Sequence, residues 1–360
     1  MPSKLVLRPS LPPSAKNAPG HAKHDNSAWR ALRREEILDP QRPIIDAHHH
    51  LWAKAGETYA LEDYLADTRA GHDIRASVYV ECGSNYRTDG PEMMNRLGEI
   101  EFAHEQAMKA AAMPRDTRVC AAIVGTADLT YGAEIARLLD AEIAASPDRV
   151  RGIRLSTKWD PDEALNHGRY VVPPRLLMDE SFREGYALLA PRNLSFDALV
   201  YHPQIPELAH LARSFPDTQI ILNHIGGLVA NTRTYRDHAG QAVAQWRTAM
   251  AELARCPNVM VKLGGLGMAY VDYGLHSLAT PASSQELARI WGPLLEFCID
   301  QFGPDRCMFE SNFPPDRDSV DFHVMWNAFK RIASGYSEDE KHELFFGTAA
   351  RVYRLKLDPP

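Results

Sequence analysis

The sequence predicts an α/β fold: a single (β/α)8 TIM barrel preceded by an N-terminal arm. Eight short apolar segments rich in β-branched residues recur along the chain, and longer amphipathic stretches with helical spacing separate most of them. Strands that alternate with helices form parallel βαβ units, and eight such units close into a barrel. A chain of 360 residues has the length for one domain of this size. An open, doubly wound sheet is the alternative fold.

The N-terminal segment differs in composition from the rest of the chain. Residues 1–27 are rich in Pro, Ser, Ala and Lys and have no hydrophobic periodicity, so we expect a disordered arm there and a barrel domain over residues 28–358. A short helix is expected from Ser27, where Ser27 or Asn26 can cap its start and Pro40 follows its end.

The barrel elements follow in order. We expect strands at residues 44–47, 76–81, 119–124, 150–155, 194–201, 219–223, 258–263 and 306–309. Candidate helices between them are residues 90–112, 132–146, 181–192, 205–216, 242–256 and 283–303. The longest irregular segments, 157–181 and 267–284, follow the fourth and seventh strands. Loops in these positions lie over the catalytic face of a barrel, so they are candidates for substrate contacts or a lid.

Composition excludes several classes of partner. The net charge is -7 with both signs mixed along the chain, so we expect neither a nucleic-acid partner nor binding to a membrane surface. No run of 18 apolar residues predicts a transmembrane helix, and the N-terminus lacks the apolar core of a secretory signal, so the expected location is cytoplasmic. Five scattered cysteines without C-x-x-C spacing indicate reduced thiols. A small-molecule substrate is the expected partner, and a homodimer would be compatible with a barrel of this size.

The first expected strand ends in a His-x-His pattern. Ile44, Ile45, Asp46 and Ala47 lead directly into His48, His49 and His50. Alternate residues of a strand point to the same side, so His48 and His50 can present their imidazoles together while His49 faces away. Such a pair suits a metal ion or a polarised water.

Further polar side chains occur where other expected strands end. In chain order they are His48, His50, Glu81, Arg154, His202, His224, Glu310, Asn312 and Asp316. The carboxyl ends of barrel strands converge on one pocket, so four histidines are expected at the same rim. This coincidence across independent strands predicts a catalytic centre.

Six motifs, in this order, resemble the amidohydrolase superfamily: IIDAHHHLW, VRGIRLS, FDALVYHPQIPEL, IILNHIGG, VKLGG and RCMFESNFPPD. The closest resemblance is to its amidohydrolase-2, TIM-barrel-fold hydrolase branch, which includes sugar lactonases and a pyrone-dicarboxylate lactonase. The resemblance runs from about Trp29 to Leu355. It implies that His48, His50, His202 and His224 correspond to the histidines of the superfamily site.

The eighth-strand motif departs from that family pattern. Relatives commonly carry an aspartate where this chain has Asn312, and an amide cannot act as a general base. Asn312 could still donate a hydrogen bond to the substrate or hold the water. Glu310, two residues earlier, is the first candidate for the replacement base or metal ligand, and Asp316 is the second.

The fourth-strand motif also departs from the dinuclear members, which place a bridging lysine there. Arg154 occupies this region, so we expect no dinuclear centre and a role for Arg154 in binding a substrate carboxylate. Glu81, Tyr86 and Lys262 are further candidates for substrate contacts.

Two alternatives are open for the cofactor: one divalent metal ion or none. His48, His50 and His202 could bind one divalent metal ion such as zinc through three nitrogens, leaving a position for water. Metal-independent catalysis, in which histidines polarise the carbonyl directly, is the alternative that the resemblance equally allows.

The resemblance implies a hydrolase that opens a lactone of a small carboxylated or hydroxylated metabolite by attack of activated water. Glu310 or Asp316 would take the proton of the water. The carbonyl oxygen would be stabilised by the four rim histidines, His48, His50, His202 and His224, or by a metal that they hold. Two alternatives remain: a metal-dependent decarboxylase of an aromatic or muconate-type acid, and a barrel that binds a metabolite without converting it.

Overall fold

The computed structural model describes residues 5–7, 26–54, 57–113, 117–166, 170–268, 271 and 273–357. Eight parallel strands form one sheet in which each strand neighbours the next in chain order. They are β2 (Pro43–His49), β5 (Asp73–Val80), β6 (Arg118–Gly125), β7 (Val150–Ser156), β9 (Ser195–Leu199), β10 (Ile220–Leu222), β11 (Val259–Leu263) and β12 (Cys307–Phe309). All eight expected strands are present, with their ends displaced by a few residues.

Hydrogen bonds close the sheet between its first and last strands. The backbone N–H of Asn312 donates to the carbonyl of His48 at 2.8 Å, and the N–H of His50 donates to the carbonyl of Phe313 at 2.8 Å. A parallel bridge joins His49 to Phe313. These contacts confirm the barrel and exclude the open sheet, because an open sheet would leave β2 and β12 on opposite edges.

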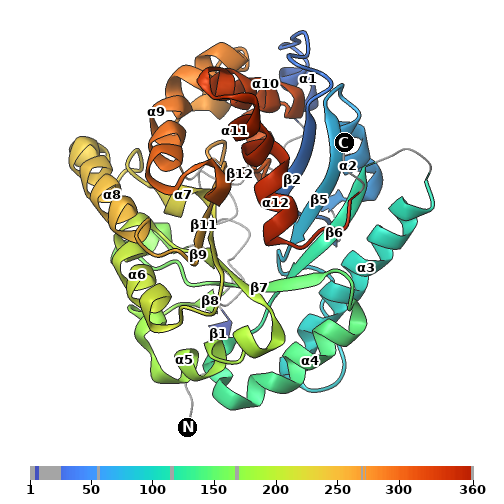
Figure 1. Cartoon of the computed structure of the whole chain (residues 1–360), viewed down its shortest axis with the longest axis vertical. Helices are drawn as coiled ribbons and strands as arrows, with labels where there is room; N and C mark the ends of the chain where they lie inside the picture. Colours follow the sequence, from blue (N-terminus) through green and yellow to red (C-terminus); the bar gives the residue numbers. More distant parts are fainter. Residues whose placement is uncertain are drawn as a thin grey trace.

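Helices surround the barrel, and the colours in Figure 1 follow the sequence around it from β2 and β5 through β7 to α9 and α10. The longer helices are α2 (Leu61–Thr68), α3 (Leu97–Ala111), α4 (Ala136–Ala145), α5 (Glu180–Tyr186), α6 (Ile205–Ser214), α8 (Ala239–Leu253), α9 (Ser284–Phe302) and α10 (Phe322–Ile332). The shorter ones are α1 (Ser27–Arg30), α7 (His224–Gly227), α11 (Glu338–His342) and α12 (Thr348–Val352). Among the described helices, none combines the length and apolar character needed to cross a bilayer.

The start of the chain differs from the expected pattern. The helix predicted from Ser27 up to Pro40 ends at Arg30. From Glu35 on, the backbone bonds to α10 and does not continue the helix. The backbone N–H of Leu38, for example, donates to Asn327 Oδ1 at 2.9 Å. Within the expected arm, β1 (Val6–Leu7) pairs with β8 (Tyr170–Val171), and the remainder of residues 1–25 lies outside the described residues, apart from Leu5.

The barrel interior is apolar at one end and polar at the other. Ile45, Val78 and Met308 pack in one apolar cluster with Val352 of α12 and with Tyr353, which follows α12. This cluster closes the end of the barrel that α12 covers. The polar side chains are therefore left at the opposite, carboxyl end of the strands.

Glu142 on α4 is a fully buried carboxyl outside the rim cluster, and it lies against Gly125 at the end of β6. Burial raises the pKa of Glu142 well above its usual value, although Arg96 acts in the opposite direction. A folded-state pKa above the unfolded value means that the unfolded chain loses this proton first as pH rises. The contribution of Glu142 to stability is therefore lost progressively above about pH 4.3, the usual glutamate pKa.

We predict that Glu142→Gln, which resembles the protonated side chain, raises the melting temperature at pH 8 and changes it little near pH 4. Thermal unfolding followed by circular dichroism across this range measures the difference. Glu163→Gln, at an exposed glutamate, is the control and should give equal shifts at both pH values. A Glu142→Gln variant that is less stable than the wild type at pH 8 would show that neighbouring groups stabilise the ionised Glu142 carboxylate in the folded protein, and would contradict the prediction.

Candidate functional site

The histidine pair at the end of β2 has the geometry that strand alternation predicts. His48 Nε2 and His50 Nε2 are 3.2 Å apart, and both side chains are buried. His49 points to the other side, where its ring stacks on Tyr64 with centroids 4.1 Å apart and its Nε2 lies 2.9 Å from Ser77 Oγ. His49 is therefore part of the packing outside the polar cluster.

His50 is held in one tautomer by the backbone of β5. Its Nδ1 lies 2.7 Å from the carbonyl oxygen of Val80, and a carbonyl can only accept, so Nδ1 carries the proton. Burial lowers the pKa of His50 well below its usual value, which keeps the ring neutral. Its Nε2 therefore directs a lone pair toward His48.

Glu310 joins two of the rim histidines. One carboxylate oxygen is 2.8 Å from His48 Nδ1, and the other is 2.7 Å from His224 Nδ1 and accepts from the backbone N–H of His224 at 3.1 Å. Glu310 has no exposed surface. Burial raises the pKa of Glu310 to about 8, while the nearby Lys262 lowers it. A carboxyl in this state can exchange a proton near neutral pH.

Two glycines of the VKLGG motif make room for this arrangement. A Cβ on Gly264 would lie 2.5 Å from Glu310 Cγ, and a Cβ on Gly265 would lie 2.4 Å from the His224 ring. Gly265 also has a φ of +69°, a conformation that favours glycine. The close approach at this pair therefore serves the two side chains of the site.

Asn312 and Asp316 bond to each other instead of to the histidines. Asn312 Nδ2 donates to one oxygen of Asp316 at 2.7 Å, and the backbone N–H of Gly267 donates to the other at 2.8 Å. Both side chains are buried. Of the two carboxyl groups predicted as the replacement base, only Glu310 contacts rim histidines in the described structure.

Arg154 is largely occupied by contacts within the protein. Its Nε donates to Glu81 Oε1 at 2.7 Å, one terminal nitrogen donates to the Glu81 carbonyl, and the other lies 3.2 Å from His48 Nε2. The Arg154 guanidinium group, which was expected to bind a substrate carboxylate, is thus bonded to Glu81. In this arrangement Arg154 and Glu81 support His48.

His202, Tyr86 and Lys262 are the remaining predicted residues of the site. His202 is buried against Tyr235 with ring centroids 5.2 Å apart, and neither of its ring nitrogens has a hydrogen-bond partner among the described residues. Burial lowers the pKa of His202 to about 4, so it is neutral. Tyr86 is partly buried in the loop after β5. Lys262 is fully buried inside the barrel, beneath His48 and away from the loops where substrate contacts were expected.

The structure groups a different set of possible metal ligands from the one the sequence suggests. Donor atoms of His48, His224 and Glu310 all lie within 4.8 Å of one another. The expected set combined His48 with His50 and His202, but the ring of His202 packs on Tyr235, after the strand has ended. Two imidazoles and one carboxylate are a donor set that suits zinc, so these residues fit a single divalent ion.

Sequence reasoning missed two buried aspartates that support the site. Asp46 accepts from the backbone N–H of Ser311 at 2.8 Å and from the Tyr64 hydroxyl at 2.8 Å. Asp197 pairs with Lys262 at 2.7 Å. A charged residue inside an otherwise apolar strand, as in IIDA and FDAL, was the available signal, because an ionised group is rarely buried without a partner.

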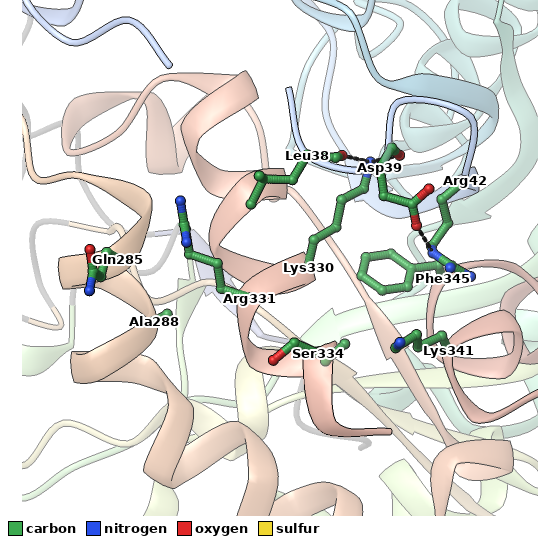
Figure 2. A pocket seen from close by; sticks show the side chains of 11 residues that line it. Leu38, Asp39, Arg42, Gln285, Ala288, Lys330, Arg331, Ser334, Lys341 and Phe345 are labelled. Carbon is green, nitrogen blue, oxygen red and sulfur yellow. Dashed lines mark hydrogen bonds and ion pairs between the residues drawn. The ribbon is translucent and has the colours of Figure 1, made fainter. Parts of the chain in front are cut away.

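A separate cavity of about 430 Å³ lies near the amino end of β2, between the preceding segment and α9, α10 and α11 (Figure 2). Its basic residues already have partners. Lys330 Nζ donates to the carbonyls of Leu38 and Asp39 at 2.9 and 2.8 Å, and Arg42 pairs with Asp39 at 2.5 Å. This cavity lacks the rim histidines and is not the candidate site.

Comparison with known proteins relates the whole barrel to one family. A family model described as amidohydrolase matches residues 45–355. The uncharacterized protein y4mH of Sinorhizobium fredii is 33% identical over 334 residues, which cover 87% of this chain and 98% of that protein. An L-fucono-1,5-lactonase of Burkholderia multivorans is 27% identical over 325 residues, covering 86% of this chain and 96% of that protein. A crystal structure of a Burkholderia multivorans amidohydrolase with bound zinc is 25% identical, with a TM-score of 0.65, and covers 87% of this chain and 99% of that one.

We predict that Gly265→Ala displaces the His224 ring from Glu310, because the new methyl group would overlap the imidazole. A crystal structure of the variant should show the 2.7 Å contact between His224 Nδ1 and Glu310 lengthened. Gly274→Ala is the matched control: Gly274 has the same φ of +69°, but no atom of the described residues lies within 4 Å of its added Cβ. Both variants should lose about 1 kcal/mol from backbone strain, and only Gly265→Ala should lose more. An undisturbed His224 in Gly265→Ala would contradict the prediction.

Proposed function

The chain belongs to the amidohydrolase family, and on that premise we propose that it is a hydrolase that opens a lactone, the cyclic ester of a small carboxylated or hydroxylated metabolite. The observation that carries the proposal is Glu310 held between His48 and His224 at the barrel rim. Relatives named L-fucono-1,5-lactonase support the class of substrate, since each matches 86% of this chain. The particular lactone depends on loop and pocket detail that the family does not fix.

The chemistry begins with deprotonation of water. Glu310 bonds to Nδ1 of His224, so the Nε2 nitrogen of that ring is directed away from the carboxylate. An ionised Glu310 accepts the Nδ1 proton in a hydrogen bond and raises the basicity of Nε2, as a carboxylate does for a catalytic histidine in a hydrolase triad. His224 then takes a proton from the water that attacks the lactone carbonyl.

Ring opening completes the balance of atoms. The water oxygen forms a bond to the carbonyl carbon, the bond from that carbon to the ring oxygen breaks, and the proton held by His224 passes to the departing ring oxygen. The product is a hydroxy acid. The carbonyl oxygen gains negative charge during attack, and neighbouring hydrogen-bond donors of the rim would stabilise it.

A divalent ion bound by His48, His224 and Glu310 would supply a further means of lowering the pKa of water and polarising the carbonyl. The relative with bound zinc supports the choice of zinc as the first ion to test. Direct action of the histidines is the alternative, and chelation distinguishes the two.

The test is proton release from a panel of sugar and dicarboxylate lactones, read with a pH indicator before and after chelation and after zinc addition. Hydrolysis of any lactone supports the proposal. Activity that persists after complete metal removal assigns the chemistry to the side chains, and activity that returns only with zinc assigns it to the ion. Folded protein, with and without metal, that opens none of the lactones would overturn the proposal.

We predict that Glu310→Gln lowers kcat by about 100-fold or more, because His224 loses the carboxylate that raises the basicity of its Nε2 and becomes a weaker general base. A glutamine side chain at this position would keep the volume of the glutamate but would carry no negative charge. Asp316→Asn is the matched control, because Asp316 bonds to Asn312 and Gly267 and should affect kcat less. Steady-state kinetics on the preferred lactone give both values, and wild-type turnover by Glu310→Gln would remove Glu310 from the mechanism.

A further inference from the structure

Lys262 of β11 lies inside the barrel directly behind His48. Its side chain has no exposed surface, and its ammonium nitrogen is 2.7 Å from Asp197 Oδ1 and 3.3 Å from His48 Nδ1. Burying an ammonium group is costly unless a carboxylate pairs with it. Asp197 supplies that pairing, so the position of the ammonium is set by the position of Asp197.

Asp197 is itself held from two other elements. Asn223 Nδ2, at the end of β10, donates to it at 3.0 Å, and the hydroxyl of Tyr353, after α12, donates at 3.1 Å. Together with Lys262, these contacts fix the carboxylate inside the barrel. The Asp197–Lys262 pair therefore holds the Lys262 ammonium in a fixed position next to Nδ1 of His48.

The opposite side of the His48 ring meets a second supported cation. Arg154 lies 3.2 Å from His48 Nε2 and is anchored by Glu81. An imidazole can flip about χ2, and a flip exchanges its nitrogen and carbon positions. A flip would place one ring carbon opposite Lys262 and Glu310 and another opposite Arg154, so these contacts oppose it. A neutral imidazole accepts through only one nitrogen, so Lys262 and Arg154 do not both donate to it.

We propose that Lys262 is a positioning residue for the reaction: the Asp197–Lys262 pair fixes the orientation of the His48 imidazole, so that Nδ1 stays on Glu310 and Nε2 stays toward His50. This role rests on the proposed hydrolase function and deepens it. Lys262 touches no reacting atom and acts through His48. A purely structural role, in which Lys262 only neutralises Asp197, makes a different prediction for the variants below.

The decisive variant removes both charges together. Lys262→Met alone leaves Asp197 buried without its partner and is expected to lose stability, whereas Lys262→Met with Asp197→Asn restores neutrality. If Lys262 positions His48, the double variant folds with a melting temperature near that of the wild type while kcat falls by about 30-fold or more and KM stays within about threefold, since the lost interaction supports the reacting geometry. If the pair is only structural, the double variant recovers turnover, and the proposal is overturned.

Lys330→Met is the matched control for losing a buried lysine. Lys330 is buried beside the separate cavity of Figure 2 and donates to the backbone carbonyls of Leu38 and Asp39, which are not part of the rim cluster. This variant should lose stability with little change in kcat. A fall in kcat equal to that of the double variant would show that the effect is general, and would overturn the proposal.

A second readout needs no substrate. Proteins labelled with nitrogen-15 in histidine report each imidazole nitrogen by NMR, and His48→Gln identifies the His48 signals by their absence. We expect the His48 Nδ1 signal to shift in the double variant and to stay unchanged in Lys330→Met; an unchanged His48 signal in the double variant would overturn the positioning role. A wild-type protein that opens no lactone would defeat the proposed function, while these spectra would still decide the positioning of His48.

Discussion

Closure of the barrel between its first and eighth strands is the constraint on which the site depends. The backbone contacts of His48 and His50 with the segment after β12 join two parts of the chain more than 260 residues apart. Asp46 strengthens this junction by accepting from the backbone and side chain of Ser311. Burial raises the pKa of Asp46 to about 6, partly offset by these hydrogen bonds. The same junction that removes the sheet edges places Glu310 against His48.

The site depends on the pairing of buried charges as well as on the side chains that could bind substrate or metal. Two carboxylates, Glu81 and Asp197, each hold a cation against the same histidine, and Glu310 lies between that histidine and His224. Burial, with added repulsion from Lys262 and Arg154, lowers the pKa of His48 well below its usual value. The imidazoles are therefore neutral, which is the form that can accept a proton or bind a metal. A cluster of this kind keeps its protonation states only while every partner stays in place.

The departure of the eighth-strand motif from the family pattern has a physical explanation in this chain. An amide at position 312 cannot take up a proton, but its Nδ2 donates to Asp316, and that contact fixes the turn after β12. The acidic function lies two residues earlier, at Glu310, where the side chain points into the barrel. The chain thus keeps a carboxyl group next to the rim histidines while the aspartate position of its relatives serves the loop.

Sequence alone was sufficient for the barrel and for the pairing of His48 with His50. Alternation along a strand and the order of strands and helices are local properties, so periodicity and motifs encode them. It also singled out Glu310, from its spacing to Asn312. The sequence could not show that Arg154 bonds to Glu81, that His202 packs on Tyr235, or that Lys262 lies behind His48. Those outcomes depend on side-chain contacts between strands far apart in the chain, which only the closed barrel brings together. Tertiary contacts likewise replaced the expected continuation of the first helix, because from Glu35 on the backbone bonds to α10.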